Sequence, residues 1–334
     1  MPKKQVYYKW SPSLGGGFAG TPEEVWGVKK YDPNQHKNEP CVFCGLYGLP
    51  DFYNLWRHKG KKYVWWAGSD IRNFIKGYWL EDGGNIFLNP DSLAEWINKY
   101  CESWVENKVE ADLLKKFGIK AKICPSFLGD IEKFNPDDIK CEFYEGEIEK
   151  PLDILEFKYQ KKIPNGITKF EPFNYKKLGE AIITRKSYYS SVSGNDWILY
   201  GWDKIAGIAK ENPQNWYYLY GNTIKPPIKF SKNVIVRGRV SQEEMDKEIK
   251  YMTGCMRLIP FEGASEILVK AILWGQDVVS LIEYPFMEKE GKMFLLSSLK
   301  GDKIKARKWW VEHLNLYPWN QNANRNICKN KRVS

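Results

Sequence analysis

The chain has 334 residues, enough for two domains, and its 43% hydrophobic and 15% aromatic content excludes a disordered protein. No apolar run approaches the roughly 18 residues of a membrane helix, the N-terminus lacks a signal-peptide stretch, and seven scattered cysteines favour a reducing cytoplasmic compartment. The formal net charge is +10, and lysines dominate it, since only nine of the 51 basic residues are arginines. This excess of lysine fits a solvated surface, or attraction to nucleic acid, anionic lipid or an anionic ligand.

Strands and helices are expected to alternate along the first part of the chain, as in parallel sheets covered by helices. A strand at 6–9 and a loop at 11–20 precede a helix from Pro22, for which Thr21 and Glu24 supply the cap. Further elements are expected as strands at 41–44, 63–67 and 120–125, and as helices at 51–56, 70–78, 92–100 and 105–117.

The stretch from about 135 to 172 is rich in Pro, Glu, Lys and Tyr and has poor periodicity, which predicts a linker with an insertion. Alternation then resumes. The elements expected there are strands at 216–220, 234–236, 255–260 and 278–280, and helices at 242–252, 265–274 and 303–314.

A glycine-rich loop, Ser11 to Gly17, lies between the first strand and the capped helix. Gly15, Gly16 and Gly17 let the backbone approach a ligand, and the helix N-terminus offers free N–H groups, so a diphosphate is a natural guest. The spacing differs from Gly-x-Gly-x-x-Gly, which disfavours a nicotinamide enzyme. The alternative is a flexible turn.

Two more strand ends carry polar groups. The strand Val64 to Ala67 runs into Gly-Ser-Asp, so Asp70 could accept a hydrogen bond from an acceptor hydroxyl, or simply cap the next helix. A second strand ends at Pro-Phe-Glu-Gly before a helix. There Glu262 could bind two ribose hydroxyls and the backbone N–H groups of Gly263, Ala264, Ser265 and Glu266 could face a phosphate; the alternative is an ordinary helix cap.

No metal site and no cofactor are expected. Cys41 and Cys44 have metal-like spacing, but no second pair or nearby histidine completes four ligands. His36, His58 and His313 are too dispersed for a metal site or a catalytic triad, and no Asp-x-Asp pair ends a strand.

Five segments together resemble a known family. The glycine loop, Trp66 to Asp70, 118–127 and 233–245 are similar in order to motifs of the large retaining glycosyltransferase family of GT-B fold (group 1, family 4-like). The most similar segment is 257–279, with Glu262-Gly263, Lys270-Ala271 and Gly275-Gln-Asp-Val-Val.

This resemblance implies an α/β protein with two Rossmann-like domains whose parallel sheets face each other across a cleft. The first domain would span 1–140, with a C-terminal helix at 303–334 packing back on it. Residues 141–174 would be the linker and insertion, and 175–302 the donor-binding domain.

One departure concerns the two glutamates that the family separates by seven residues. Glu262 fits the first position, but the second is Lys270, which cannot accept hydrogen bonds from ribose. Lys270 could meet a phosphate, Glu266 could compensate one turn earlier, or the activity could differ.

The resemblance implies a metal-independent transferase that moves a sugar from a nucleotide-diphosphate donor to a hydroxyl, with retention. The amides at 263–266 and a basic group would bind the diphosphate, Asp70 would orient the acceptor or the sugar, and Glu262 would hold the pentose. The candidate basic groups are Arg185, Lys186, Lys204 and Arg257. The acceptor could be a glycan, a lipid-linked glycan or a hydroxymethylated pyrimidine in DNA, and a non-catalytic nucleotide-sugar-binding protein is a further alternative.

Overall fold

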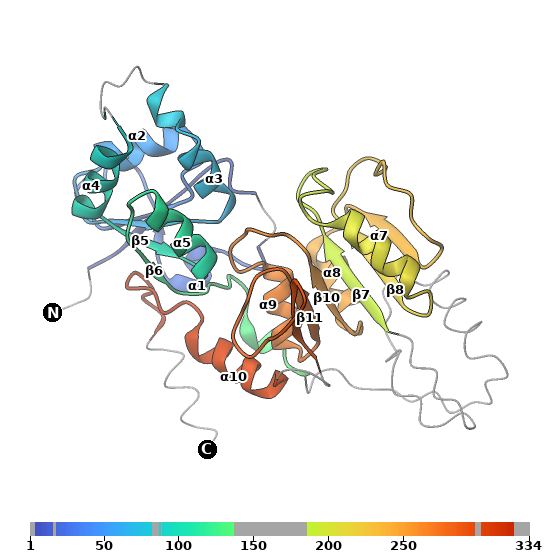
Figure 1. Cartoon of the computed structure of the whole chain (residues 1–334). Coiled ribbons are helices and arrows are strands. Elements are labelled where there is room, and N and C mark those ends of the chain that lie inside the picture. The colour runs from blue at the N-terminus through green and yellow to red at the C-terminus, as the bar shows by residue number, and fades with distance from the viewer. Residues whose placement is uncertain are drawn as a thin grey trace. The chain divides into compact units, whose positions relative to one another are not determined.

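A computed structural model of the chain describes residues 4–15, 18–81, 87, 89–136, 186–297 and 302–323, which form two compact units (Figure 1). The first unit gathers Met1–Asp130, Phe261–Glu266 and Trp310–Ser334, and the second gathers Ile131–Pro260 and Ile267–Trp309. The division therefore assigns the short segment Phe261–Glu266 to the first unit, although the sequence suggested that it belongs to the donor domain. The expected linker at 141–174 lies outside the described residues.

The first unit contains one six-stranded sheet. Its strands are β1 (Tyr7–Trp10), β2 (Lys29–Lys30), β3 (Cys41–Cys44), β4 (Lys62–Trp65), β5 (Cys101–Val105) and β6 (Ala121–Ile123), in the order β2-β1-β3-β4-β5-β6. All five pairings are parallel. The α/β class and the parallel sheet expected from the sequence are confirmed for this unit.

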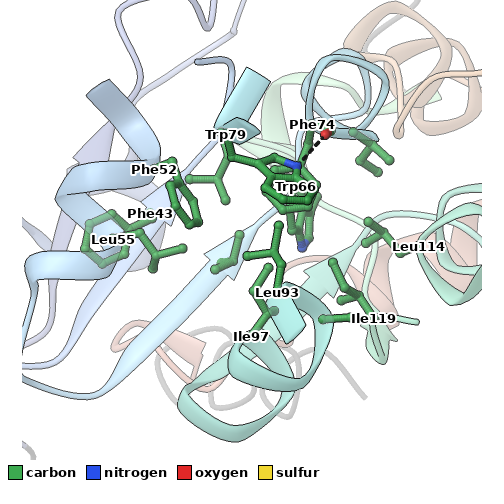
Figure 2. Close-up of a cluster of buried hydrophobic side chains, with 14 of the residues drawn as sticks. Phe43, Phe52, Leu55, Trp66, Phe74, Trp79, Leu93, Ile97, Leu114 and Ile119 are labelled. Atoms are coloured by element: carbon green, nitrogen blue, oxygen red, sulfur yellow. Dashed lines mark hydrogen bonds between the residues drawn. The ribbon is translucent and has the colours of Figure 1, made fainter. Parts of the chain in front are cut away.

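Helices cover both faces of this sheet, because alternate residues of each strand point to opposite sides. Phe43 and Val64 pack with α2 (Leu49–Arg57), α3 (Ser69–Ile75), α4 (Pro90–Tyr100) and α5 (Lys108–Lys116), in the cluster drawn in Figure 2. Val42 and Trp65 pack on the other side with α1 (Pro22–Trp26) and Trp319. All residues of β3 and β4 are buried, as in a central parallel strand.

Helix capping follows the sequence closely in α1. Thr21 accepts a hydrogen bond from the Glu24 amide, and the Glu24 carboxylate accepts one from the Thr21 amide, so the expected capping box is confirmed. The helix expected at 105–117 is partly wrong, since it begins at Lys108 behind an Asn107 cap and follows strand β5. Pairing with β4 and β6 holds β5 in place although Glu102 and Ser103 are poor strand formers.

The second unit contains a seven-stranded sheet. Its strands are β7 (Ser187–Ser191), β8 (Trp216–Tyr220), β9 (Val234–Gly238), β10 (Gly254–Arg257), β11 (Asp277–Ser280), β12 (Glu288–Glu290) and β13 (Met293–Leu296), in the order β12-β13-β11-β10-β7-β8-β9. Strands β7 to β11 are parallel, which again confirms the expected class. The antiparallel hairpin of β12 and β13, which pairs with β11, was not expected.

The helices of the second unit are α7 (Trp202–Glu211), α8 (Gln242–Ile249), α9 (Glu266–Leu273) and α10 (Lys303–His313), of which α10 continues into the first unit. Trp202, Ile205 and Ala209 of α7 pack on Tyr217 and Leu219 of β8. Every residue of α9 after Glu266 is buried, so this helix lacks a solvated face. Short 3-10 helices lie at Tyr78–Leu80 and Ile131–Lys133. No helix in the described part of the chain is long and apolar enough to cross a membrane.

Candidate functional site

The parallel strands of each sheet include one point at which the strand order reverses direction. In the first unit the chain goes from β1 to β2 on one side and to β3 on the other; in the second it goes from β7 to β8 and later returns to β10 on the other side. Ligands of open α/β sheets bind outside the carboxyl ends of the strands at such a switch point. Each unit therefore presents a candidate binding region of its own.

The glycine loop begins at the switch point of the first unit. The Ser11 amide donates to the Cys44 carbonyl across the switch at 3.0 Å, and the Ser11 hydroxyl donates to Asp51 at 2.6 Å. Gly15 is exposed, and no atom lies within 4 Å of a Cβ built on it. Gly16 and Gly17 lie outside the described residues, so the phosphate-binding role of this loop stays a prediction.

Asp70 lies in the interior of the first unit rather than on its surface. Its carboxylate is fully buried and accepts hydrogen bonds from the amides of Leu46 (2.9 Å), Ala67 (3.0 Å) and Ile71 (2.8 Å). Burial raises the pKa of Asp70 to about 7, although these three bonds favour the charged form. The Asp70 side chain links the loop after β3 to the loop after β4, so its expected contact with a substrate is corrected to a structural role. The alternative that Asp70 caps the next helix is also corrected, because the N-cap of α3 is Gly68.

Two buried glutamates that sequence reasoning missed follow β5. Glu106 accepts hydrogen bonds from the Ser126 hydroxyl and from the Ala264 amide, the latter at 2.7 Å, and the Glu106 amide donates to Glu110 at 2.9 Å. Burial, together with the neighbouring carboxylates, raises the pKa of both side chains. The sequence analysis missed β5 and began the next helix at 105, so it placed Glu106 and Glu110 in that helix. The signal that could have found them is the position of Glu106 directly after a strand.

The segment Phe261–Glu266, expected to bind phosphate, is held in the first unit by its own protein contacts. Asn107 donates its side-chain amide to the Glu262 carbonyl at 2.6 Å, and Glu266 accepts from the amides of Ala19 (3.0 Å) and Leu128 (3.2 Å). Because Glu106 accepts the Ala264 N–H, this amide is already engaged. The expectation that the Ala264 amide is open to a diphosphate is therefore corrected.

Gly263 has a packing reason to be glycine. A Cβ at this position would lie 1.9 Å from Glu106 Oε2, and a Cβ on Gly68 would lie 2.8 Å from the Gly263 nitrogen. The sequence analysis expected the amides of this turn to face a phosphate, but the group that lies against Gly263 is a carboxylate of the same chain.

In the second unit, Arg257 lies at the switch point as the last residue of β10. Its guanidinium donates to the carbonyl and hydroxyl of Ser191, the last residue of β7, and lies over the ring of Tyr200 at 4.5 Å from the centroid. Gly201, with φ of 73°, lets the start of α7 approach, because a Cβ there would be 2.6 Å from Leu258 Cβ. Lys204 is exposed in the first turn of α7.

Lys186 does not join Arg257. Lys186 precedes β7 and lies 3.9 Å from Asp277, the first residue of β11, so it is at the amino ends of these strands. A five-residue strand separates its two ends by about 16 Å, so we correct the assignment of Lys186 to the same diphosphate. Arg185 lies outside the described residues.

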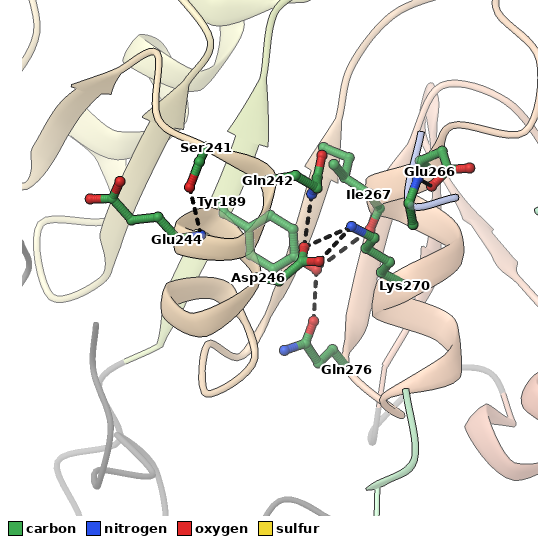
Figure 3. A network of polar contacts seen from close by, with 10 residues as sticks. Tyr189, Ser241, Gln242, Glu244, Asp246, Glu266, Ile267, Lys270 and Gln276 are labelled. Atoms are coloured by element: carbon green, nitrogen blue, oxygen red, sulfur yellow. Dashed lines mark hydrogen bonds and ion pairs between the residues drawn. The ribbon is translucent and has the colours of Figure 1, made fainter. Parts of the chain in front are cut away.

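Lys270 forms an ion pair with Asp246 instead of facing the donor phosphate that the sequence suggested. The side chain is fully buried in α9, and its ammonium donates to both carboxylate oxygens of Asp246 on α8, at 2.7 and 2.9 Å (Figure 3). Asp246 also accepts from Gln242 at 2.9 Å. The suggestion that Lys270 meets a phosphate is corrected: it forms a buried ion pair between two helices.

Metal-binding groups are not clustered in the described ranges, where no set of three His, Cys, Asp or Glu side chains could hold an ion. Cys41 and Cys44 are free, buried thiols of β3, and burial raises the pKa of each.

No protein-family model matches the chain, and no curated protein matches it. Among solved structures, HepE of Anabaena in complex with UDP-glucose matches with a TM-score of 0.46 and 12% identity, over 98% of this chain and 99% of that one. TarM of S. aureus matches at 0.41 and 13% over 88% and 53% of the two chains, and the pneumococcal O-GlcNAc transferase GtfA at 0.37 and 11% over 86% and 51%.

Proposed function

We propose that the chain is a nucleotide-sugar glycosyltransferase of GT-B type whose second unit binds the diphosphate of the donor. The observation that carries the proposal is the position of Arg257, a buried guanidinium at the carboxyl end of β10, at the switch point of a mostly parallel sheet. The order of the sequence motifs supports a sugar as the transferred group.

An arginine suits this role for a physical reason. Guanidinium is always charged and presents a planar fork of donors that matches phosphate oxygens. Stacking on Tyr200 and the bond to Ser191 fix the plane of Arg257 before a ligand arrives. A cation held in this way would stabilise the charge that develops on a leaving diphosphate, an effect typically worth about 3–4 kcal/mol.

The proposed reaction transfers the sugar to a hydroxyl acceptor with retention of configuration and without a metal. The bond between the sugar and the diphosphate breaks, a bond to the acceptor oxygen forms, and the acceptor proton passes to the leaving phosphate. This route needs no nucleophile from the protein. The exposed Lys204 would supply a second, more mobile charge near the diphosphate.

The test is release of nucleoside diphosphate from a panel of nucleotide sugars, combined with binding of each nucleotide by calorimetry. Arg257→Gln should weaken donor binding roughly ten- to a hundred-fold, in line with loss of a charge-assisted contact. Arg57→Gln is the matched control, because Arg57 also stacks on a tyrosine, Tyr53, but lies in the first unit. Equal donor binding by both variants would remove Arg257 from the site.

The same assay separates the acceptor alternatives. Transfer to a glycan or lipid-linked glycan should be insensitive to competing duplex DNA. A DNA acceptor requires DNA affinity that falls steeply with salt. Binding of a nucleotide sugar without turnover of any acceptor or of water would identify a non-catalytic binding protein.

A further inference from the structure

Two carboxylates of the first unit meet at Gly263, in the turn Phe261–Glu266. A Cβ built on Gly263 would overlap Glu106 Oε2 and would lie 3.5 Å from Glu110 Oε1, so both oxygens face the same glycine. A Cβ built on Gly68 would lie 3.0 Å from the same Glu110 oxygen. Both glutamates are buried, so their carboxylates are neighbours away from water.

The hydrogen-bond partners of the two carboxylates differ. Glu106 accepts from the Ser126 hydroxyl through Oε1 and from the Ala264 amide through Oε2, so each of its oxygens has a donor. Glu110 accepts from the Glu106 amide through Oε2, whereas its Oε1 has no hydrogen-bond partner among the described residues. A buried carboxylate oxygen without a donor costs free energy, because it has lost its contacts with water.

Basic side chains do not neutralise this pair of glutamates. No ion pair among the described residues involves Glu106 or Glu110. The other titratable groups that face the pair are all acids, namely Asp70 of α3, Glu262 and Glu266 of the turn, and, beside Glu106, Cys124 and Tyr317. Arg72 of α3 lies instead over the ring of Phe261, 5.7 Å from its centroid. Two like charges in such surroundings repel each other, so full ionisation of both glutamates is costly.

We propose that Oε1 of Glu110 carries a proton in the folded protein at neutral pH and that this proton joins the two carboxylates. Once protonated, Oε1 is a donor that faces the Glu106 carboxylate, so it gains the hydrogen bond that it otherwise lacks. Glu110 is the better holder of the proton, because Glu106 has two donors, and both favour the charged form of that side chain. Burial raises the pKa of Glu110, and the charge of Glu106 raises it further.

The proton makes the stability of the first unit depend on pH. The unfolded chain releases it near the ordinary glutamate pKa of 4.5, whereas the folded chain keeps it to higher pH, so the folded chain binds more protons in between. This contribution is fully present below pH 4.5 and is lost as the pH rises. Each pH unit lowers the ratio of folded to unfolded chains about ten-fold for the one proton. The proton is held whether or not the chain binds a nucleotide sugar.

The test compares two isosteric variants of the full chain, Glu110→Gln and Glu106→Gln, by urea denaturation from about pH 6 to pH 9. Glutamine at 110 keeps an oxygen for the Glu106 amide and places an N–H donor where the proton would be, so stability at pH 7 should hold or rise. Its profile should be flatter than that of the unaltered chain by about ten-fold per pH unit. Glutamine at 106 offers one acceptor to two donors, so the ratio of folded to unfolded chains should fall roughly ten-fold or more at every pH.

Infrared spectroscopy detects the proton directly. A protonated carboxyl group has its own carbonyl stretch, so the difference spectrum between the unaltered chain and Glu110→Gln at neutral pH should contain this band. Parallel pH profiles for these two proteins, a difference spectrum without the band, or a larger loss of stability in Glu110→Gln than in Glu106→Gln would each overturn the proposal. If Glu106→Gln does not fold, its failure agrees with the expected loss, and the profile and spectrum of Glu110→Gln still decide the outcome.

Discussion

At the scale of single residues, Gly263 shows how one missing Cβ positions a whole turn. Replacing it with alanine would force the methyl group into the Glu106 carboxylate, which would break the bond to the Ala264 amide or shift the turn. We expect Gly263→Ala to lower the free energy of unfolding by about 2–3 kcal/mol, measured by urea denaturation.

The matched variant is Gly207→Ala. Gly207 lies inside α7, and no atom is within 4 Å of a Cβ built on it. This change should raise the free energy of unfolding by about 0.5–1 kcal/mol, because alanine is the better helix former. Similar effects from both substitutions would show that the contact with Glu106 does not constrain Gly263.

His58 gives a pH dependence at the same scale. It is buried, with Nδ1 3.1 Å from the Tyr31 hydroxyl, and burial lowers its pKa from 6.5 to about 4. The unfolded chain therefore binds a proton that the folded chain does not, so this contribution is present above pH 6.5 and is lost as the pH falls toward 4. Its full size is about 3 kcal/mol.

We expect His58→Gln to lose less stability than the unaltered chain between pH 6.5 and 4. Urea denaturation of the two proteins at a series of pH values measures the difference. Parallel profiles for the unaltered chain and His58→Gln would mean that His58 titrates in the folded state as it does in the unfolded state.

At the scale of elements, the ion pair between Lys270 and Asp246 joins α9 to α8 where the sequence suggested a ligand contact. Asp246→Leu would leave a fully buried ammonium without its partner and should cost about 3–5 kcal/mol of stability. The double variant Lys270→Met/Asp246→Leu should recover most of this loss, because an apolar pair of similar volume can replace a buried ion pair.

Nucleotide binding by the double variant separates the two roles of Lys270. If Lys270 only forms the ion pair with Asp246, the double variant should bind the donor within about two-fold of the unaltered chain. If Lys270 binds a phosphate of the donor, the affinity for the donor should fall about ten-fold or more. The double-mutant cycle in urea supplies the coupling energy between the two side chains.

Elements with strong local signals were predictable from the sequence. The capping box of Thr21 and Glu24 and the Ser241 cap of α8 were found because their patterns are local. Strands β5 and β7 and helix α7 were missed. The two strands have polar sequences that form strands only because they pair with neighbouring strands. The candidate site followed the same rule. Arg257 was one of four basic candidates and was expected inside a strand at 255–260, whereas β10 ends at Arg257. The partners of Ala264 and Lys270 come from distant segments that no local pattern reveals.

At the scale of the whole molecule, the chain returns to its first unit twice, and the second return is the larger. Tyr317 and Trp319 stack on each other at 4.4 Å, and Trp26 meets both rings edge-on. The Tyr317 hydroxyl donates to the Cys124 carbonyl at 2.7 Å, and Asn315 donates to the Phe127 carbonyl at 2.7 Å. These contacts bury large aromatic surfaces that residues 1–130 cannot cover alone.

We therefore expect a chain ending at residue 309 to lose the stability of its first unit. Removing Tyr317 and Trp319 exposes Trp26 and forfeits aromatic burial on the order of 5 kcal/mol, comparable with the whole stability of a typical domain. Near-ultraviolet circular dichroism and limited proteolysis within 1–130 measure the loss. A chain ending at residue 323 keeps every contact described for this return and should behave like the full chain. If the chain ending at residue 309 resists proteolysis as well as the full chain, the first unit folds without residues 310–323. The aromatic cluster would then contribute little to the stability of a unit that 1–130 already specifies.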